Sequence, residues 1–439
     1  MQLTGATVVV ADPHDPSRDH SDPLVFTDGW VHHGPATADD DTLDVTGCVV
    51  TPGLVNAHHH LLQSGFRTLP GTRAVPMRDW LPRMAAAYAG AGIDPSLVSA
   101  TTAAGVAEGL LTGVTTVADH HLNWPAGASA EQTVEIADAI AASARGLGSR
   151  LVYVRGSARD DPRTAADSAQ AMAEHFLSTG HHGGVTADGM LQFAVGPAGV
   201  HSDAEETFRL LGDVAREWGL RRRTQANEQV DIEIALERYG RRPLDLLEGW
   251  GWLEPGVTIA HLCDVTEDEI ARLAQAGITA THAPGCDVPM GWGIAPVRRL
   301  LEAGITVGLG TSGGGSNDAG HLLADARLAM QVSGLVGQQL EARSVLAMAT
   351  AGSADGLGRS DLGRLTPGSR ADACVWDVSG VADAGVADPV GGLLWASPGR
   401  RPRHVIVGGE VVVRDYALVT DDEDRIVAAL EARLQRGPA

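Results

Sequence analysis

Three consecutive histidines, His58, His59 and His60, end an apolar, β-branched run that starts at residue 49. In an extended strand, residues two apart share a face, so the side chains of His58 and His60 are expected on one side and that of His59 on the other. Paired imidazoles on one face of a strand are suited to bind zinc or iron. A chance cluster of polar side chains is the alternative for this triplet taken alone.

Other chemically active residues follow short apolar runs further along the chain. His261, His282 and Glu228 each stand at or just beyond the end of such a run. When parallel strands close into a barrel, their carboxyl ends meet at one face, where the active site is built. The repeated placement therefore predicts one site assembled from several strands.

The elements that would position these residues alternate regularly. Between about residues 51 and 365, β-branched runs alternate with Ala- and Leu-rich segments of helical period, which is typical of repeated βα units. We expect strands at residues 49–58, 114–119, 150–156, 190–196, 220–227, 257–261, 278–282 and 305–311. Helices are expected at residues 131–145, 204–218, 267–276 and 342–349. Such units predict an α/β fold, a closed (β/α)8 TIM barrel, with a doubly wound open sheet as the alternative.

The two ends of the chain have a different pattern. Residues 1–50 and 366–439 contain short apolar runs interrupted by Gly, Asp and Pro, which is typical of strands and tight turns. Neither end could close a core alone, so we expect the two to pair into one small β-sandwich domain beside a barrel of residues 51–365. A chain of 439 residues is long enough for this division.

The charge of the chain restricts its partners. With 33 basic and 55 acidic residues the formal net charge is −22, which disfavours nucleic acid, anionic membranes and phosphate-rich substrates. The alternative is that this charge only maintains solubility. The sequence has no apolar run of membrane-spanning length, no leader pattern at its start and no CxxC pair among its four cysteines. We therefore expect a cytoplasmic protein whose substrate is a neutral or cationic small molecule.

Several segments resemble one known family. The segments that carry the resemblance to the amidohydrolase superfamily are PGLVNAHHHLLQ, IAHL, THAP, GLGTSGGGSND and GRSDLGRLTPGSRADACVWD. The most similar branch is that of the triazine hydrolases and the guanine and 8-oxoguanine deaminases. The resemblance implies hydrolytic removal of an amino, alkylamino or halide group from an sp2 ring carbon of a purine, pterin, pyrimidine or s-triazine. Because barrels of this kind frequently associate, we also expect a homodimer.

The resemblance assigns roles to residues. It implies one divalent metal, with zinc expected and iron as the alternative, bound by His58, His60 and His261. Glu228 would be the proton shuttle and His282 would assist near the leaving group, so the catalytic residues would be Glu228, His261 and His282. A bound metal lowers the pKa of water to about 7, and a carboxylate within reach can carry its proton to the departing group.

Two positions depart from the pattern of the family. Gln225 stands where the fifth strand normally provides a ligating histidine, and Ser312 stands in place of the metal-binding aspartate. A glutamine amide oxygen is a weaker donor toward zinc than an imidazole, so the metal affinity should fall. Gln225 and Ser312 are therefore atypical candidate ligands.

Three hypotheses stay open at this point. In the first, the metal binds through the three histidines, with Gln225 or water completing its coordination. In the second, the enzyme is metal-independent and performs a ring opening, cyclisation or elimination, with Arg223 near Glu228 holding a carboxylate and a substrate group. In the third, the chain is a catalytically silent homologue that binds a small molecule.

Polar and aromatic residues near the candidate strand ends are interpreted as substrate-binding. They are Gln63, Trp80, Trp124, Arg155, His201 and Asn227. Flat aromatic rings suit stacking on a flat heterocycle, although ordinary packing is an equal alternative for each tryptophan.

Overall fold

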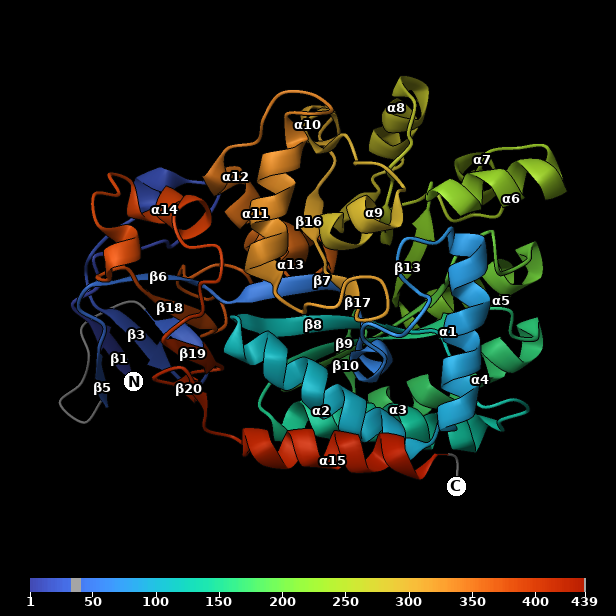
Figure 1. Ribbon diagram of the computed structural model, residues 1–439, viewed down its shortest axis with the longest axis horizontal. Helices are drawn as coiled ribbons and strands as arrows, with labels where there is room; N and C mark the ends of the chain where they lie inside the picture. The colour runs from blue at the N-terminus through green and yellow to red at the C-terminus, as the bar shows by residue number, and fades with distance from the viewer. Residues whose placement is uncertain (33–40, 438–439) are drawn as a thin grey trace.

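The computed structural model describes residues 1–32 and 41–437, and its main body is a closed barrel of parallel strands (Figure 1). In order around the barrel, the strands are β7 (Leu54–His60), β8 (Val114–His121), β9 (Arg150–Ser157), β12 (Leu191–Pro197), β13 (Arg221–Ala226), β14 (Val257–His261), β15 (Thr279–His282), β16 (Val307–Leu309) and β17 (Ser312–Gly313). The last barrel strand is interrupted, since β16 pairs with β15 and β17 pairs with β7, which closes the ring. The predicted (β/α)8 barrel is confirmed.

Helices follow the barrel strands and surround them (Figure 1). They are α1 (Met77–Ala91), α2 (Pro95–Leu111), α3 (Ala130–Gly146), α4 (Pro162–Leu177), α5 (Glu205–Trp218), α6 (Gln229–Tyr239), α7 (Pro243–Gly249), α8 (Glu267–Gln275), α9 (Pro284–Met290), α10 (Val297–Glu302), α11 (Leu322–Ser333), α12 (Ala342–Ala347) and α13 (Ser353–Gly356). Helix α3 shows why they form: Ser129 and Gln132 make a reciprocal capping box at its start. Its buried residues recur at helical spacing and are Thr133, Ile136, Ala137, Ile140 and Ala144.

The strand predicted at residues 49–58 is in fact two strands in different sheets. Strand β6 (Cys48–Pro52) belongs to a terminal sheet, and β7 belongs to the barrel. Gly53 separates them, and a Cβ at this position would lie 2.1 Å from Oγ1 of Thr115, so only glycine allows the close approach. The Pro52–Gly53 pair, a combination typical of turns, was the sign of this break in the sequence.

Strand β7 also contains a β-bulge just before the histidines. Asn56 is opposite Val117 and His59 is opposite Asp119, so β7 has one more residue than β8 over this stretch. A bulge changes the direction of the side chains that follow it and frees a backbone group from the ladder. The bulge therefore helps to set the direction of His58.

The segments at the two ends of the chain share a sheet, because β6 pairs antiparallel with β18. The remaining strands of this sheet are β2 (Val8–Val9), β18 (Ala373–Asp377), β19 (His404–Val407), β20 (Glu410–Arg414) and β21 (Ala417–Leu418). A second small sheet contains β1 (Gln2–Thr4), β3 (Leu24–Thr27), β4 (Trp30–His32) and β5 (Thr42–Asp44). Apolar side chains from both sheets form a separate core, which includes Leu3, Phe26, Val50, Val375 and Ile406.

The C-terminal segment is not purely β-structured as its pattern suggested. It also contains α14 (Pro389–Trp395) and α15 (Glu423–Arg436), and α15 runs beside α2 on the barrel (Figure 1). Arg433 anchors α15 by donating to the carbonyl oxygens of Ala91 and Gly92. Among the helices of the described ranges, none has the length and hydrophobicity needed to cross a membrane.

Candidate active site

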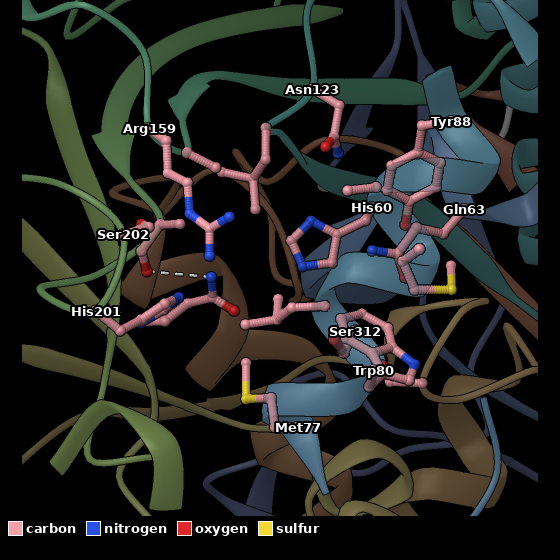
Figure 2. A pocket seen from close by; sticks show the side chains of 18 of the residues that line it. His60, Gln63, Met77, Trp80, Tyr88, Asn123, Arg159, His201, Ser202 and Ser312 are labelled. Carbon is pink, nitrogen blue, oxygen red and sulfur yellow. Dashed lines mark hydrogen bonds between the residues drawn. The ribbon is translucent and has the colours of Figure 1, made fainter. Parts of the chain in front are cut away.

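A cavity of ≈ 150 Å³ lies at the carboxyl ends of the barrel strands. His60 at the end of β7, Gln225 near the end of β13 and Ser312 at the start of β17 all line it. Figure 2 shows the His60 ring between Arg159 on one side and Tyr88 and Gln63 on the other. The strand ends therefore bring together residues that are far apart in the sequence, as the barrel predicts.

His58 and His60 point to the same region, as the strand period predicts. Their ring centroids are 4.8 Å apart, with an interplanar angle of 82°. Nδ1 of His60 lies 2.7 Å from the carbonyl oxygen of His120, so Nδ1 carries the proton and Nε2 presents its lone pair. Nε2 of His58 is buried and has no hydrogen-bond partner in the described part of the chain. Burial lowers the pKa of His58 well below its ordinary value and that of His60 to about 4, so both rings are neutral at pH 7.

His59 faces away from this region and joins two strands. Its Nδ1 contacts the carbonyl oxygen of Ser312 and lies 3.1 Å from Oγ1 of Thr311. These contacts link β7 to the interrupted last strand of the barrel. His59 is thus a structural residue.

His261 is held on both ring nitrogens. Nδ1 lies 2.6 Å from Oδ1 of Asp287, and Nε2 lies 3.0 Å from Oε1 of Gln225. The His261 ring centroid is 5.2 Å from that of His58. The Nε2 amide of Gln225 donates to the carbonyl oxygen of Ala198 at 3.1 Å, which fixes the amide so that its oxygen faces His261.

The side chains in this region are of the types that bind a divalent metal, although the group whose ligand atoms all lie within 4.8 Å of one another among the described residues is His261, Cys286 and Asp287. His58 offers an unpartnered Nε2, while His60 and His261 each have Nδ1 bound to an oxygen, which is the usual way in which ligating imidazoles are oriented. Gln225 adds a neutral amide oxygen beside His261. Three imidazole nitrogens and one oxygen suit zinc, and imidazole also suits iron. Ser312 lines the cavity beside them.

A carboxylate suited to proton transfer adjoins this set. Oε1 of Glu228 lies 3.5 Å from Nε2 of His261, and Oε2 of Glu228 is buried with no partner among the residues that the structure describes. Burial raises the pKa of Glu228, although His261 and His201 oppose the increase. Burial alone would lower the pKa of His261, but Asp287 and Glu228 raise it above the ordinary value.

Asp287 was not predicted from the sequence. It lies in the first turn of α9, is fully buried, and lies 3.7 Å from Nδ1 of His282 as well as contacting His261. An aspartate in a first helical turn ordinarily interacts with the helix terminus, so its position in the sequence carries no sign of a second role. His282 lies beside Asp287 but does not line the cavity, and burial lowers its pKa to about 4.

Of the six predicted substrate-binding residues, Gln63, Trp80 and His201 line the cavity. Trp80 donates its indole N–H to the carbonyl oxygen of Gly315 at 3.1 Å, which fixes its ring in the wall. His201 is oriented by Asp231, whose Oδ1 lies 3.3 Å from its Nδ1.

The other three predicted substrate-binding residues do not line the cavity, because local contacts occupy them. Arg155 pairs with Asp160 at 2.8 Å, and Trp124 lies against this guanidinium, 4.9 Å from ring centroid to Cζ. The side-chain amide of Asn227 donates to the carbonyl oxygen of Asp264 at 2.8 Å. A position near a strand end was therefore not enough to predict which of the six residues line the cavity.

Helix α1 provides much of the cavity wall, which the sequence interpretation missed except for Trp80. Its contributions are Met77, Trp80, Leu81, Met84, Ala85 and Tyr88. The spacing of residues 77, 80, 84 and 88 is that of one helical face, so periodicity could have grouped them. The opposite wall includes Arg159, whose guanidinium points inward in Figure 2.

The metal-independent hypothesis placed Arg223 near Glu228. In the structure the two side chains do not contact each other. Arg223 is buried, and its Nη2 donates to the carbonyl oxygen of Ala57, within the β-bulge of β7. Burial, together with Arg221, lowers the pKa of Arg223 to about 9, so the guanidinium remains charged at neutral pH.

Comparisons with known proteins agree with this geometry. A family model described as the amidohydrolase family matches residues 49–412. The 8-oxoguanine deaminase of Pseudomonas aeruginosa is 33% identical over 412 residues, covering 91% of this chain and 89% of the relative. The 5-methylthioadenosine/S-adenosylhomocysteine deaminase of Halobacterium salinarum is 32% identical over 395 residues, covering 89% of this chain and 87% of the relative.

Solved structures are also similar over nearly their whole length. A triazine hydrolase variant superposes with a TM-score of 0.92 at 32% identity, with 99% of both chains covered. The atrazine chlorohydrolase of Arthrobacter aurescens complexed with zinc superposes with a TM-score of 0.90 at 33% identity, again with 99% of both chains covered.

Proposed function

Because this chain belongs to the amidohydrolase family, we propose that it removes an amino, alkylamino or halide group by hydrolysis from an sp2 carbon of a small N-heterocycle. The relatives include purine-type deaminases and a triazine chlorohydrolase, so both kinds of leaving group occur among similar proteins. The observation that carries the proposal is the convergence of His58, His60, His261 and Glu228 beside one cavity.

The proposal includes one divalent metal, with zinc favoured by the zinc-complexed structural neighbour and iron as the alternative. His58, His60 and His261 would hold it, with Gln225 as an unusual fourth donor and Ser312 nearby. When bound, a metal of this kind lowers the pKa of water to about 7, which provides a nucleophile near neutral pH. A neutral amide donor holds zinc less firmly than imidazole, so we expect a site that loses its metal readily.

The protein's own residues would manage the protons. Glu228 accepts a proton from the attacking water on a carboxylate oxygen and delivers it to the departing group. Its raised pKa makes the carboxylate a stronger proton acceptor than an ordinary glutamate. Asp287 holds His261 in one orientation, and the carbonyl oxygen of His120 does the same for His60.

The cavity favours a compact ring as the substrate. A cavity of about 150 Å³ holds a benzene-sized ring, so the ≈ 150 Å³ here matches the size of a single small ring. Met77, Leu81 and Met84 provide an apolar wall, which suits alkyl groups. Trp80 and Trp292 add flat surfaces against which a ring can stack. The predicted homodimer and cytoplasmic location remain proposals.

The test is turnover of a heterocycle panel by purified protein, with ammonia and halide release as readouts. The panel includes aminopurines, aminopyrimidines, pterins, chloro- and alkylamino-triazines, and matched nucleosides. We expect turnover of at least one free heterocycle, loss of activity on dialysis against a chelator and recovery with zinc. Absence of turnover with zinc, iron or manganese would contradict the proposed hydrolase, and chelator-resistant turnover would contradict its metal dependence.

A further inference from the structure

Arg223 differs from the other buried arginines of this protein. Six buried arginines each contact a carboxylate within the described residues, and they are Arg150, Arg155, Arg222, Arg359, Arg400 and Arg433. Arg223 is also buried, at 3% exposure, but no carboxylate of the described ranges pairs with it. Burying a charge without a partner is costly, so this exception calls for a physical account.

The guanidinium of Arg223 lies beneath the candidate active site. Arg223 precedes Gln225 by two residues on β13, so both side chains point to the same side of the strand. Its Nη2 donates to the carbonyl oxygen of Ala57, which is in the peptide bond that joins Ala57 to His58. Its Nη1 is buried with no partner in the described chain.

Two buried carboxylates, Glu228 and Asp287, lie at the same end of the barrel. We infer that Arg223 is a fixed positive charge that partly balances them and thereby lowers the affinity of the site for a divalent metal. This inference rests on the metal site proposed above. Repulsion between one positive charge and a divalent cation within about 10 Å exceeds what a tenfold change in affinity requires, even at an effective dielectric constant of about 20.

The positive charge of Arg223 and the neutral side chains of Gln225 and Ser312 all lower the affinity of the site for a metal. Gln225 and Ser312 are neutral, so neither adds a negative charge to attract a cation. Arg223 then repels the cation from below. Together they describe a site from which the metal is exchanged easily.

The experiment measures zinc affinity of metal-free protein by competition with a chromogenic chelator. Arg223→Met removes the charge while keeping a side chain of similar length. Arg221→Met is the matched control, because Arg221 is two residues further from the carboxyl end of the same strand and donates to the carbonyl oxygen of Gly356 at 2.8 Å. Arg223→Lys keeps the charge. Circular dichroism and thermal unfolding check that each variant is folded.

We expect Arg223→Met to bind zinc at least about tenfold more tightly than the unmodified protein and Arg223→Lys to stay within about threefold of it. Arg221→Met should tighten zinc binding less than Arg223→Met does, because the repulsion falls with distance and Arg221 is partly exposed to solvent. Equal or weaker binding by folded Arg223→Met would overturn the inference and make Arg223 only a positioning residue for His58. If Arg223→Met does not fold, Arg223→Gln removes the charge but retains a donor for Ala57, and the same outcomes apply.

The same measurements distinguish a failure of this inference from a failure of the proposed function. If all variants bind zinc equally and the unmodified protein turns over a heterocycle, the inference is wrong while the proposed function stands. If no variant binds zinc, both the metal site and the inference are wrong.

Discussion

Oδ1 of Asp287 lies 2.6 Å from Nδ1 of His261, and both side chains are buried. The contact brings the first turn of α9 against the end of β14. It leaves Nε2 of His261 facing Gln225 and Glu228. A carboxylate that accepts a hydrogen bond from one nitrogen of an imidazole fixes the tautomer of the ring. It also makes the other nitrogen, here Nε2, a stronger metal ligand. Asp287 therefore orients His261 although it does not line the cavity.

Asp287→Asn should reduce kcat/KM and zinc affinity by about 10- to 100-fold, because His261 loses its charged partner. Asp264→Asn is the control, since that carboxylate is exposed and lies three residues beyond His261. Steady-state kinetics and chelator competition measure the two effects. An unchanged zinc affinity in Asp287→Asn would mean that His261 does not ligate the metal.

Glu228→Gln should reduce kcat by about 10²- to 10⁴-fold while substrate binding is retained, because the amide has the same shape but cannot shuttle a proton. Glu233→Gln on the exposed face of α6 is the matched control and should be near wild-type activity. Single-turnover kinetics separate the chemical step from binding. Equal losses in both variants would argue against a specific role for Glu228.

Gln225→His should raise zinc affinity by at least about tenfold, because imidazole is a stronger donor toward zinc than an amide oxygen. Gln225→Ala should lower the affinity, since it removes the oxygen beside His261. Metal analysis of protein purified without added metal, together with chelator competition, gives both results. If Gln225→Ala retains full affinity, the coordination is completed by another group.

Asp119 should make the protein less stable as the pH rises. Burial raises the pKa of this carboxyl from 3.8 to about 7, so the folded protein binds its proton more tightly than the unfolded chain does. The proton on Asp119 contributes its full stabilisation of the folded protein below the pKa that Asp119 has in the unfolded chain. This contribution is lost as the pH rises through the pKa that Asp119 has in the folded protein. The free energy of unfolding then falls by up to ~4 kcal/mol.

Asp119→Asn removes this titration and keeps an oxygen for the N–H of Leu61. Urea unfolding at about pH 5 and about pH 8 should show a smaller difference between the two pH values in the variant than in the unmodified protein. The same difference in both proteins would mean that Asp119 is already ionised at low pH, or that it stays protonated throughout.

The sequence by itself determined the alternation of strands and helices, the barrel and the shared direction of His58 and His60. These features depend on local periodicity, which a sequence carries directly: a period of two aligns histidines on β7, and a period near 3.6 marks helices such as α3. The family motifs then placed Glu228 and His261 at strand ends, where the structure brings them within 3.5 Å of each other.

Only the tertiary structure decided which of the neighbouring polar residues share the site. Asp287 reaches His261 because α9 packs across the end of β14, while Arg155 is withdrawn from the cavity by its pairing with Asp160. Arg223, which has no carboxylate partner among the described residues, donates to a carbonyl oxygen within a bulge of another strand, at Ala57. Such contacts join residues that are distant in sequence and depend on where loops and strand ends turn, so no local pattern records them.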